Sequence, residues 1–356
     1  MQFIEKKLKI ENSGAPSSHL FIDIETTGLK AESSIPYLIG IASVCGDDVS
    51  FCQWLIESKG EVKEALEDII AYTSQFDTFV SFNGDRFDLP YLDYHARQCG
   101  LCSPFLTKNS LDIFKRIKCL KNLFSMSGAG QKNFEAFIGD GRIDHENGGE
   151  LIKVYYDYIR TGDEDALAKI LLHNEEDVLG MPRLFALFPY ADLHDRSITV
   201  CENAPEIVKR DDEELLLRFT TKANFKYKIA KFFGEYYVSI EGNQICLKVP
   251  IYNGELKYFY PHAREYYYLP KEDMAIHKSV GTFTDPAFRQ QATMETCYQK
   301  KCGAFIPLIK DTYKEIYRKS YKDKPYAELK DELLSDAGFW NNYLHDLFNL
   351  IRRNAL

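Results

Sequence analysis

The chain has 356 residues, of which 45% are hydrophobic and 27% are charged, a balance typical of a globular protein with room for two domains. It contains no run of about 18 apolar residues that could cross a membrane, and its N-terminal sequence MQFIEKKLKIENSG lacks the apolar centre of a signal peptide. We therefore expect a cytoplasmic protein with no membrane partner, and we expect its nine cysteines to be free thiols.

The formal net charge of −9 is unevenly distributed along the chain. Residues 1–194 have 19 basic and 30 acidic side chains, whereas residues 195–356 have 25 and 23. An acidic protein is a poor general binder of phosphate backbones, but a site that concentrates carboxylates around metal ions would contribute to this imbalance. The second part also holds 15 of the 23 tyrosines. These shifts predict two domains, 1–190 and 191–356.

The first predicted element is a buried strand over residues 19–25 (HLFIDIE), which ends at a Thr-Thr-Gly turn. Alternating or continuous apolar runs predict further strands, and the strands 36–44 and 49–56 are joined by a short turn and so form an antiparallel hairpin. Apolar residues spaced by three and four predict the helices. Together these elements predict an α/β fold, in which helices flank a mixed sheet. The further strands are 36–44, 49–56 and 78–82, and the helices are 61–75, 88–99, 150–160 and 163–188.

The second domain is predicted to be mostly antiparallel β, with a helical tail over about 326–352. The pairs Gly242-Asn243 and Asn253-Gly254 are typical hairpin turns, so we expect them to separate neighbouring strands. The predicted strands are 235–241, 244–251, 255–260 and 265–269.

Asp23 and Glu25 lie two residues apart on the first predicted strand, so both side chains point to the same face. Two carboxylates held this close repel each other unless a proton or a cation lies between them. A hard divalent cation such as Mg²⁺ or Mn²⁺ prefers oxygen ligands of this kind. The alternative is that one is a solvent-exposed residue at a strand end and the other caps the following turn.

Two later segments contain further candidate ligands. Asp88 follows a predicted strand and begins a predicted helix, while His173 and Asp177 are four residues apart on another helix and so share a face. The alternatives are that Asp88 is only a helix N-cap and that His173 and Asp177 form a surface ion pair near a helix end.

Together these segments resemble the DEDD 3′–5′ exonuclease superfamily, which has a ribonuclease H-like fold and includes the proofreading domains of DNA polymerases. Its YprB-like branch of predicted bacterial exonucleases is similar also at Gly-Gly-Glu (148–150), at the Tyr-rich segment 155–158 and at Thr-Gly-Asp (161–163). The resemblance covers about residues 19–189. The motifs that carry it are Asp-x-Glu-Thr-Thr-Gly (23–28), Asn-x-x-x-Phe-Asp-x-Pro-Tyr-Leu (83–92) and His-Asn-x-x-Asp-Val (173–178).

The resemblance implies that Asp23, Glu25, Asp88 and Asp177 hold two divalent cations, Mg²⁺ or Mn²⁺. His173 would orient or deprotonate the attacking water. The implied reaction is hydrolysis of phosphodiester bonds from the 3′ end of a nucleic acid, DNA or RNA, with a single strand as the expected substrate. The alternative function is a non-catalytic ribonuclease H-like module that binds nucleic acid or docks on a partner.

The chain departs from the family at His173. The Tyr branch of the family has Tyr-x-x-x-Asp and the His branch has His-x-x-x-x-Asp, whereas this chain combines His with the Tyr spacing. An imidazole thus occupies a tyrosine-like position on the helix. Its role as base, hydrogen-bond donor or passive positioner stays open, as does the alternative of a buried His whose hydrogen bonds are satisfied.

Five further residues are candidates for contacting the substrate: Thr26, Thr27, Gly28, Asn83 and Phe87. By resemblance, the segment after the first two acids approaches the 3′ nucleotide. The alternatives are turn geometry, with Gly28 supplying an unusual φ, a turn role for Asn83 and a core role for Phe87.

Residues 222–232 of the second domain interleave lysines with aromatic residues. This pattern is typical of a strip that binds a single strand and also of a half-buried element with a solvated lysine face. We expect the domain either to guide the substrate or to bind a protein partner.

Overall fold

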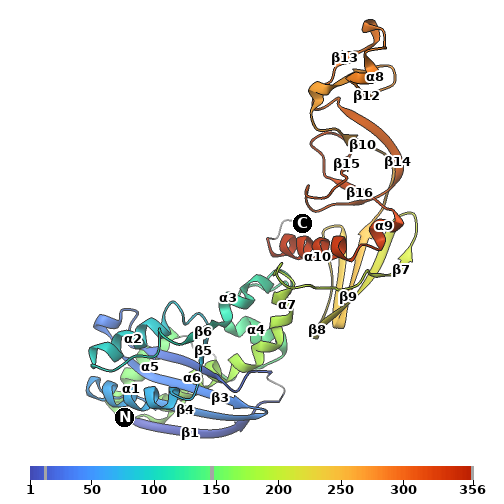
Figure 1. The fold of residues 1–356 in the computed structure, drawn as a ribbon. Helices are drawn as coiled ribbons and strands as arrows, with labels where there is room; N and C mark the ends of the chain where they lie inside the picture. The colour runs from blue at the N-terminus through green and yellow to red at the C-terminus, as the bar shows by residue number, and fades with distance from the viewer. Residues whose placement is uncertain (12–13, 145–147, 354–356) are drawn as a thin grey trace. The chain divides into compact units, whose positions relative to one another are not determined.

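The computed structural model describes residues 1–11, 14–144 and 148–353. They form two compact units, Met1–Ala191 and Asp192–Leu356, whose elements are labelled in Figure 1. Within the described ranges, no helix is both long and apolar enough to cross a membrane.

The N-terminal unit is built on a six-stranded mixed sheet with the order β1-β4-β3-β2-β5-β6. The first four strands in this order pair antiparallel, whereas β2, β5 and β6 run parallel to one another. The predicted mixed sheet is therefore confirmed. The strands are β1 (Gln2–Lys9), β2 (His19–Thr26), β3 (Pro36–Cys45), β4 (Asp48–Leu55), β5 (Thr78–Ser81) and β6 (Asn109–Asp112).

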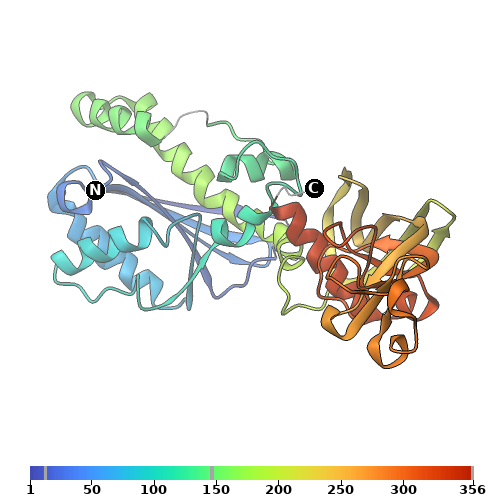
Figure 2. The same cartoon turned by 90° about the horizontal axis from the view of Figure 1, so that it is seen from above.

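Two layers of helices cover the two faces of this sheet, as Figure 2 shows. On one face, Leu20, Ile22 and Ile24 of β2 enter a core with α1 and α2. On the other face, Tyr37 and Leu38 of β3 pack against α5 and α6. The flanking helices were predicted and are confirmed. The helices are α1 (Val62–Thr73), α2 (Asp88–Gln98), α3 (Ile113–Ile117), α4 (Gln131–Ile138), α5 (Gly148–Thr161), α6 (Glu164–Gly180) and α7 (Phe188–Asp192).

The predicted helix over 163–188 is too long, because α6 ends at Gly180. Pro182 follows two residues later and begins a 3-10 segment, Met181–Leu187. Proline has no N–H for an α-helical hydrogen bond and its ring clashes with the preceding turn, which explains why the regular helix stops here.

The C-terminal unit is mostly antiparallel β, as predicted. It contains two three-stranded sheets, β7-β8-β9 and β12-β11-β13, and a closed barrel of β10, β14, β16 and β15. Its strands are β7 (Glu206–Arg210), β8 (Glu214–Phe233), β9 (Tyr236–Pro250), β10 (Tyr252–Phe259), β11 (Tyr266–Leu269), β12 (Met274–His277), β13 (Gln290–Gln291), β14 (Tyr298–Pro307), β15 (Tyr317–Arg318) and β16 (Tyr326–Glu328), and its helices are α8 (Lys278–Gly281), α9 (Asp331–Leu334) and α10 (Ala337–Arg352).

Both predicted hairpin turns are wrong. Residues 242–243 lie inside β9, and residues 253–254 lie inside β10. Gly242 does have a positive φ of 58°, but it sits opposite an irregularity in the pairing with β8. Its conformational freedom therefore serves a bulge in the long pairing of β8 with β9 rather than a turn.

The lysine-rich segment 222–232 belongs to β8, a strand of 20 residues. Phe225 is buried while Lys222, Lys226 and Lys228 are exposed, which is the alternation of a half-buried strand. Phe232 at its end is 66% exposed. The interpretation as a half-buried element with a solvated lysine face is the one that fits.

Candidate metal centre

Strand β2 places two acids on the face of the sheet that α6 covers. Asp23 and Glu25 alternate with Ile22 and Ile24, which point into the core under α1 and α2. The Glu25 side chain approaches His173 of α6, and Asp23 accepts a hydrogen bond from Asn174 of the same helix. The prediction that both acids share one face therefore agrees with the geometry.

Asp88 begins α2 and reaches β2 from the neighbouring edge. Its Oδ1 accepts a hydrogen bond from the backbone N–H of Ile24 at 3.2 Å, at a point where the pairing of β2 with β5 has ended at Phe21 and Val80. Gly84 makes this approach possible, because a Cβ there would lie 2.9 Å from Asp88 Oδ2. Asp88 thus starts a helix and also accepts a hydrogen bond from a backbone N–H of β2 beyond the last residue pair of β2 and β5.

His173 and Asp177 lie one turn apart on α6 and face the same acids. The His173 Nε2 atom is 3.3 Å from Glu25 Oε1 and 3.3 Å from Asp177 Oδ2. One ligand atom from each of these three residues lies within 4.8 Å of the others. Since His173 is only 5% exposed, the interpretation as a surface ion pair is wrong.

Asn174 holds Asp23 in place, and sequence reasoning missed its role. Its Nδ2 donates to Asp23 Oδ2 at 2.9 Å, and its Oδ1 accepts from Gln53 Nε2 at 2.9 Å. Gly40 of β3 is paired with Asp23, and a Cβ at Gly40 would lie 2.1 Å from Asn174 Oδ1. The buried amide therefore depends on a glycine that is distant in sequence.

The segment after α4 contributes Arg142 and Asp144, and α4 itself contributes Lys132 and Glu135, all charged residues that sequence reasoning missed. Asp144 Oδ2 lies 2.7 Å from His173 Nδ1 and 3.0 Å from Lys132 Nζ. Arg142 contacts Asp177 Oδ1 at 2.6 Å and also forms an ion pair with buried Glu135. The segment after α4 has no apolar periodicity. Its charged residues at 140–144 match no motif, and they were the sequence feature that could have pointed to a role at the site.

Burial and mutual repulsion both favour the protonated forms of the acids. Burial, followed by the charges of Asp177 and Asp88, raises the pKa of Asp23 well above its ordinary value. The same causes in the same order raise the pKa of Glu25 to about 8. Burial raises the pKa of Asp88 to about 7, although backbone N–H groups oppose this shift.

This set of donors fits divalent cations. Carboxylate oxygens from β2, α2 and α6 converge. The raised pKa values of Asp23, Glu25 and Asp88 indicate that the neighbouring side chains leave the negative charge of these three acids poorly balanced. A hard cation such as Mg²⁺ or Mn²⁺ would replace the protons. Asp23, Glu25, Asp88 and Asp177 are the residues that could hold it.

The five candidate substrate contacts lie around β2 and the start of α2. Thr26 Oγ1 donates to the Gly28 carbonyl at 2.9 Å, and Thr27 Oγ1 accepts from the Ile35 N–H, so both hydroxyls shape the turn. Gly28 is not among the described residues with positive φ, so the suggestion of an unusual φ is wrong. A Cβ there would instead lie 3.2 Å from the Ser34 Cβ.

The other two candidates lie in the 82–88 segment. Asn83 is exposed with a φ of 67°, and its N–H donates to Asp112 Oδ1 at 2.9 Å. It is therefore a turn residue whose side chain faces outward. Phe87 is half-buried against the core and its ring lies 5.4 Å from that of Tyr91.

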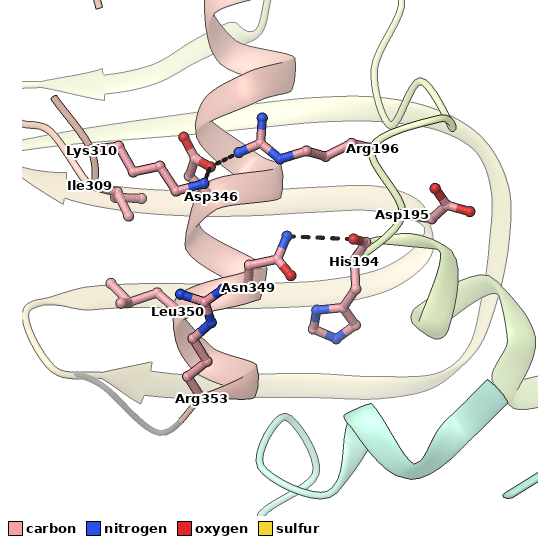
Figure 3. A pocket seen from close by; sticks show the side chains of 9 residues that line it. All are labelled: His194, Asp195, Arg196, Ile309, Lys310, Asp346, Asn349, Leu350 and Arg353. Carbon is pink, nitrogen blue, oxygen red and sulfur yellow. Dashed lines mark hydrogen bonds and ion pairs between the residues drawn. The ribbon is translucent and has the colours of Figure 1, made fainter. Parts of the chain in front are cut away.

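A second cluster of charges lines a pocket of about 430 Å³ within the C-terminal unit, shown in Figure 3. Asp346 of α10 is 3% exposed and forms ion pairs with Arg196 and with Lys310 Nζ, the latter at 2.6 Å. Arg353 projects into the same pocket. Here cations outnumber the buried acid.

Two kinds of solved structure are similar to the chain. A family B DNA polymerase from the hyperthermophilic archaeon Pyrobaculum calidifontis is 13% identical, with a TM-score of 0.39, over 68% of this chain and 34% of the polymerase. A product-bound exonuclease I is 11% identical, with a TM-score of 0.25, over 94% of this chain and 71% of that protein. The chain thus spans about a third of the polymerase.

Comparison with curated proteins gave no match. A family model described as the RNase H superfamily matches residues 20–188. This range contains the strands from β2 to β6, the helices that cover them and all four candidate metal ligands. The N-terminal unit therefore has a ribonuclease H-like fold, and the RNase H superfamily model matches most of its residues.

Proposed function

We propose that the protein is a metal-dependent nuclease that removes nucleotides from the 3′ end of a nucleic acid strand. The observation that carries the proposal is the convergence of Asp23, Glu25, Asp88 and Asp177 from three elements into one cluster, in which Glu25 and Asp88 are buried and the other two acids are half-buried. Structural acids are usually paired with cations when buried. Here the neighbouring carboxylate Asp177 is the largest influence on Asp23 and Glu25 after burial itself.

In this proposal, the four carboxylates hold two divalent cations. Such ions, when bound, stabilise the attacking and leaving oxygens of an in-line displacement and make water a better nucleophile near neutral pH. Asp88 and Asn174 fix the cluster, because each hydrogen-bonds to the β2 segment that contains Asp23 and Glu25. His173 is positioned at the same cluster by Asp144.

The 3′–5′ direction and the preference for a single strand rest on the resemblance to DEDD exonucleases. The Thr26–Gly28 turn directly follows Glu25 and would lie beside the terminal nucleotide. Asn83 and Phe87 belong to the segment that leads into Asp88. We infer that these two segments form the contact with the 3′ end, and that the C-terminal unit guides the strand or binds a partner.

The test is cleavage of 5′-labelled single-stranded DNA and RNA with Mn²⁺, with Mg²⁺ and with chelator. We expect metal-dependent ladders that shorten from the 3′ end and vanish in Asp88→Asn. Asp85→Asn is the matched control, because Asp85 lies in the same segment but pairs with Lys115. Undiminished binding without cleavage under either metal would instead favour the non-catalytic module.

A further inference from the structure

The position of His173 is not that of one partner in a simple ion pair, because its Nε2 atom lies between two carboxylates. Its Nε2 lies equally far, at 3.3 Å, from Glu25 Oε1 and from Asp177 Oδ2. A charge-assisted N–H···O bond is about 2.7–2.9 Å long, so the imidazole is not committed to donating a proton to either carboxylate. The three ligand atoms lie within 4.8 Å of one another, which suits ligands of one ion at bond lengths of about 2.0–2.2 Å.

The opposite edge of the ring determines which nitrogen offers a lone pair. His173 Nδ1 lies 2.7 Å from Oδ2 of Asp144, which is itself buried and contacted by Lys132. An ionised carboxylate can only accept hydrogen bonds, so Nδ1 is the donor to Asp144. In the neutral imidazole, the form that binds metals, this leaves the Nε2 lone pair facing Glu25 and Asp177. A carboxylate that holds a histidine in this way is the common second partner of metal-bound imidazoles.

We propose that His173 is itself a ligand of the metal centre, together with Glu25 and Asp177, and that Asp144 positions it. This inference rests on the proposed metal-dependent function and adds a nitrogen to a set of oxygen donors. It also accounts for the departure from the family pattern, since a histidine with the tyrosine spacing places its Nε2 between two acids.

The consequence is a preference among metals. Mg²⁺ favours oxygen ligands in near-ideal octahedral geometry. An imidazole ligand suits transition metals instead, and the affinity of such a site for divalent metals increases from Mn²⁺ to Cu²⁺. We therefore expect the full chain to bind Mn²⁺ more tightly than Mg²⁺, and His173→Gln to narrow that difference. Asp144→Asn should weaken Mn²⁺ binding by about 10–100-fold, the usual effect of losing such a second partner.

Pulsed electron paramagnetic resonance of Mn²⁺ added to the full chain tests the nitrogen ligand directly. The expected result is a ¹⁴N coupling that becomes a ¹⁵N coupling when histidine is ¹⁵N-labelled, a test that needs no substitution. The coupling should disappear in His173→Gln and persist in His95→Gln, whose imidazole belongs to α2.

The outcomes separate this inference from the proposed function. One outcome is that Mn²⁺ binds without a nitrogen coupling and that Asp88→Asn abolishes this binding. This outcome would overturn the role of His173 and leave the nuclease proposal intact. Failure of the wild-type chain to bind Mn²⁺ at all would overturn both. A Mn²⁺ affinity that stays unchanged in both His173→Gln and Asp144→Asn would also refute the inference.

Discussion

The two units differ in the charges that surround their buried acids. In the C-terminal pocket a single buried carboxylate, Asp346, contacts two cations, Arg196 and Lys310. In the N-terminal cluster, burial and neighbouring carboxylates raise the pKa values of Asp23 and Glu25. Side chains alone balance the first acid, whereas the second group would gain from an external cation. The contrast suggests that the first arrangement is structural and the second binds metal.

The largest expected effect is on activity. Asp23→Asn should lower metal-dependent cleavage by at least about 10³-fold, the scale of losing an essential group. The same substitution should raise the melting temperature in chelator, because the amide removes repulsion and can still accept from Asn174. Nuclease assays and thermal unfolding of one preparation measure both. A variant that loses activity and also loses stability without metal would contradict this account.

The next effect is the pH dependence of stability without metal. The pKa of Glu25 is about 8 and that of Asp88 about 7 in the folded chain, above their unfolded values of about 4. The folded state therefore binds more protons, and stability falls as pH rises from about 4 to about 8. We expect a loss on the order of a few kcal/mol between pH 5 and pH 8.

Thermal unfolding in chelator across this range gives the measurement. Saturating Mn²⁺ should flatten the decline, since metal binding favours the deprotonated acids. A melting temperature that rises with pH in chelator would contradict the sign of these shifts.

A smaller effect is expected for Asn174→Ala, which frees the Asp23 carboxylate without removing a charge. Metal affinity should fall by about 10–100-fold, as calorimetric titration with Mn²⁺ would show. Glu175→Gln is the matched control, because the neighbouring Glu175 pairs with Lys6. Equal affinity in the two variants would show that the orientation of Asp23 does not matter.

The smallest effect is expected for Asp346→Asn. It should lower the free energy of unfolding by about 1–2 kcal/mol, because its partners Arg196 and Lys310 are 49% and 42% exposed and solvent screens them. Chemical denaturation with and without Mn²⁺ should give the same loss. A loss that depends on metal would break the contrast between the two clusters.

The sequence predicted those parts of the molecule that depend on local pattern. The strand with Asp23 and Glu25 was visible because apolar residues flank it, and Asp88, His173 and Asp177 were visible through motif spacing. Strand β1 was missed because every second residue is exposed and the others are only half-buried, so it lacks an apolar run.

The supporting residues could not be predicted, because their partners are distant in the chain. Asp144 meets His173 across 29 residues and Asn174 meets Asp23 across 151. Nothing in the sequence near Asp144 predicts a helix face or strand face that would aim it. The hairpin turn predicted at Gly242 was wrong for a related reason. Gly242 lies opposite an irregularity in β8, and the sequence around Gly242 gives no sign of it.

Gly40 shows how such a centre could be lost without any change to its acids. A methyl group at this position would come within 2.1 Å of the Asn174 amide oxygen, so Asn174 would have to move away from Asp23. A descendant gene with an ordinary side chain here would keep every motif and still encode a protein whose proposed metal centre is distorted. When relatives of this chain are sorted into active and inactive members, the residue on the neighbouring strand should count as much as the four carboxylates.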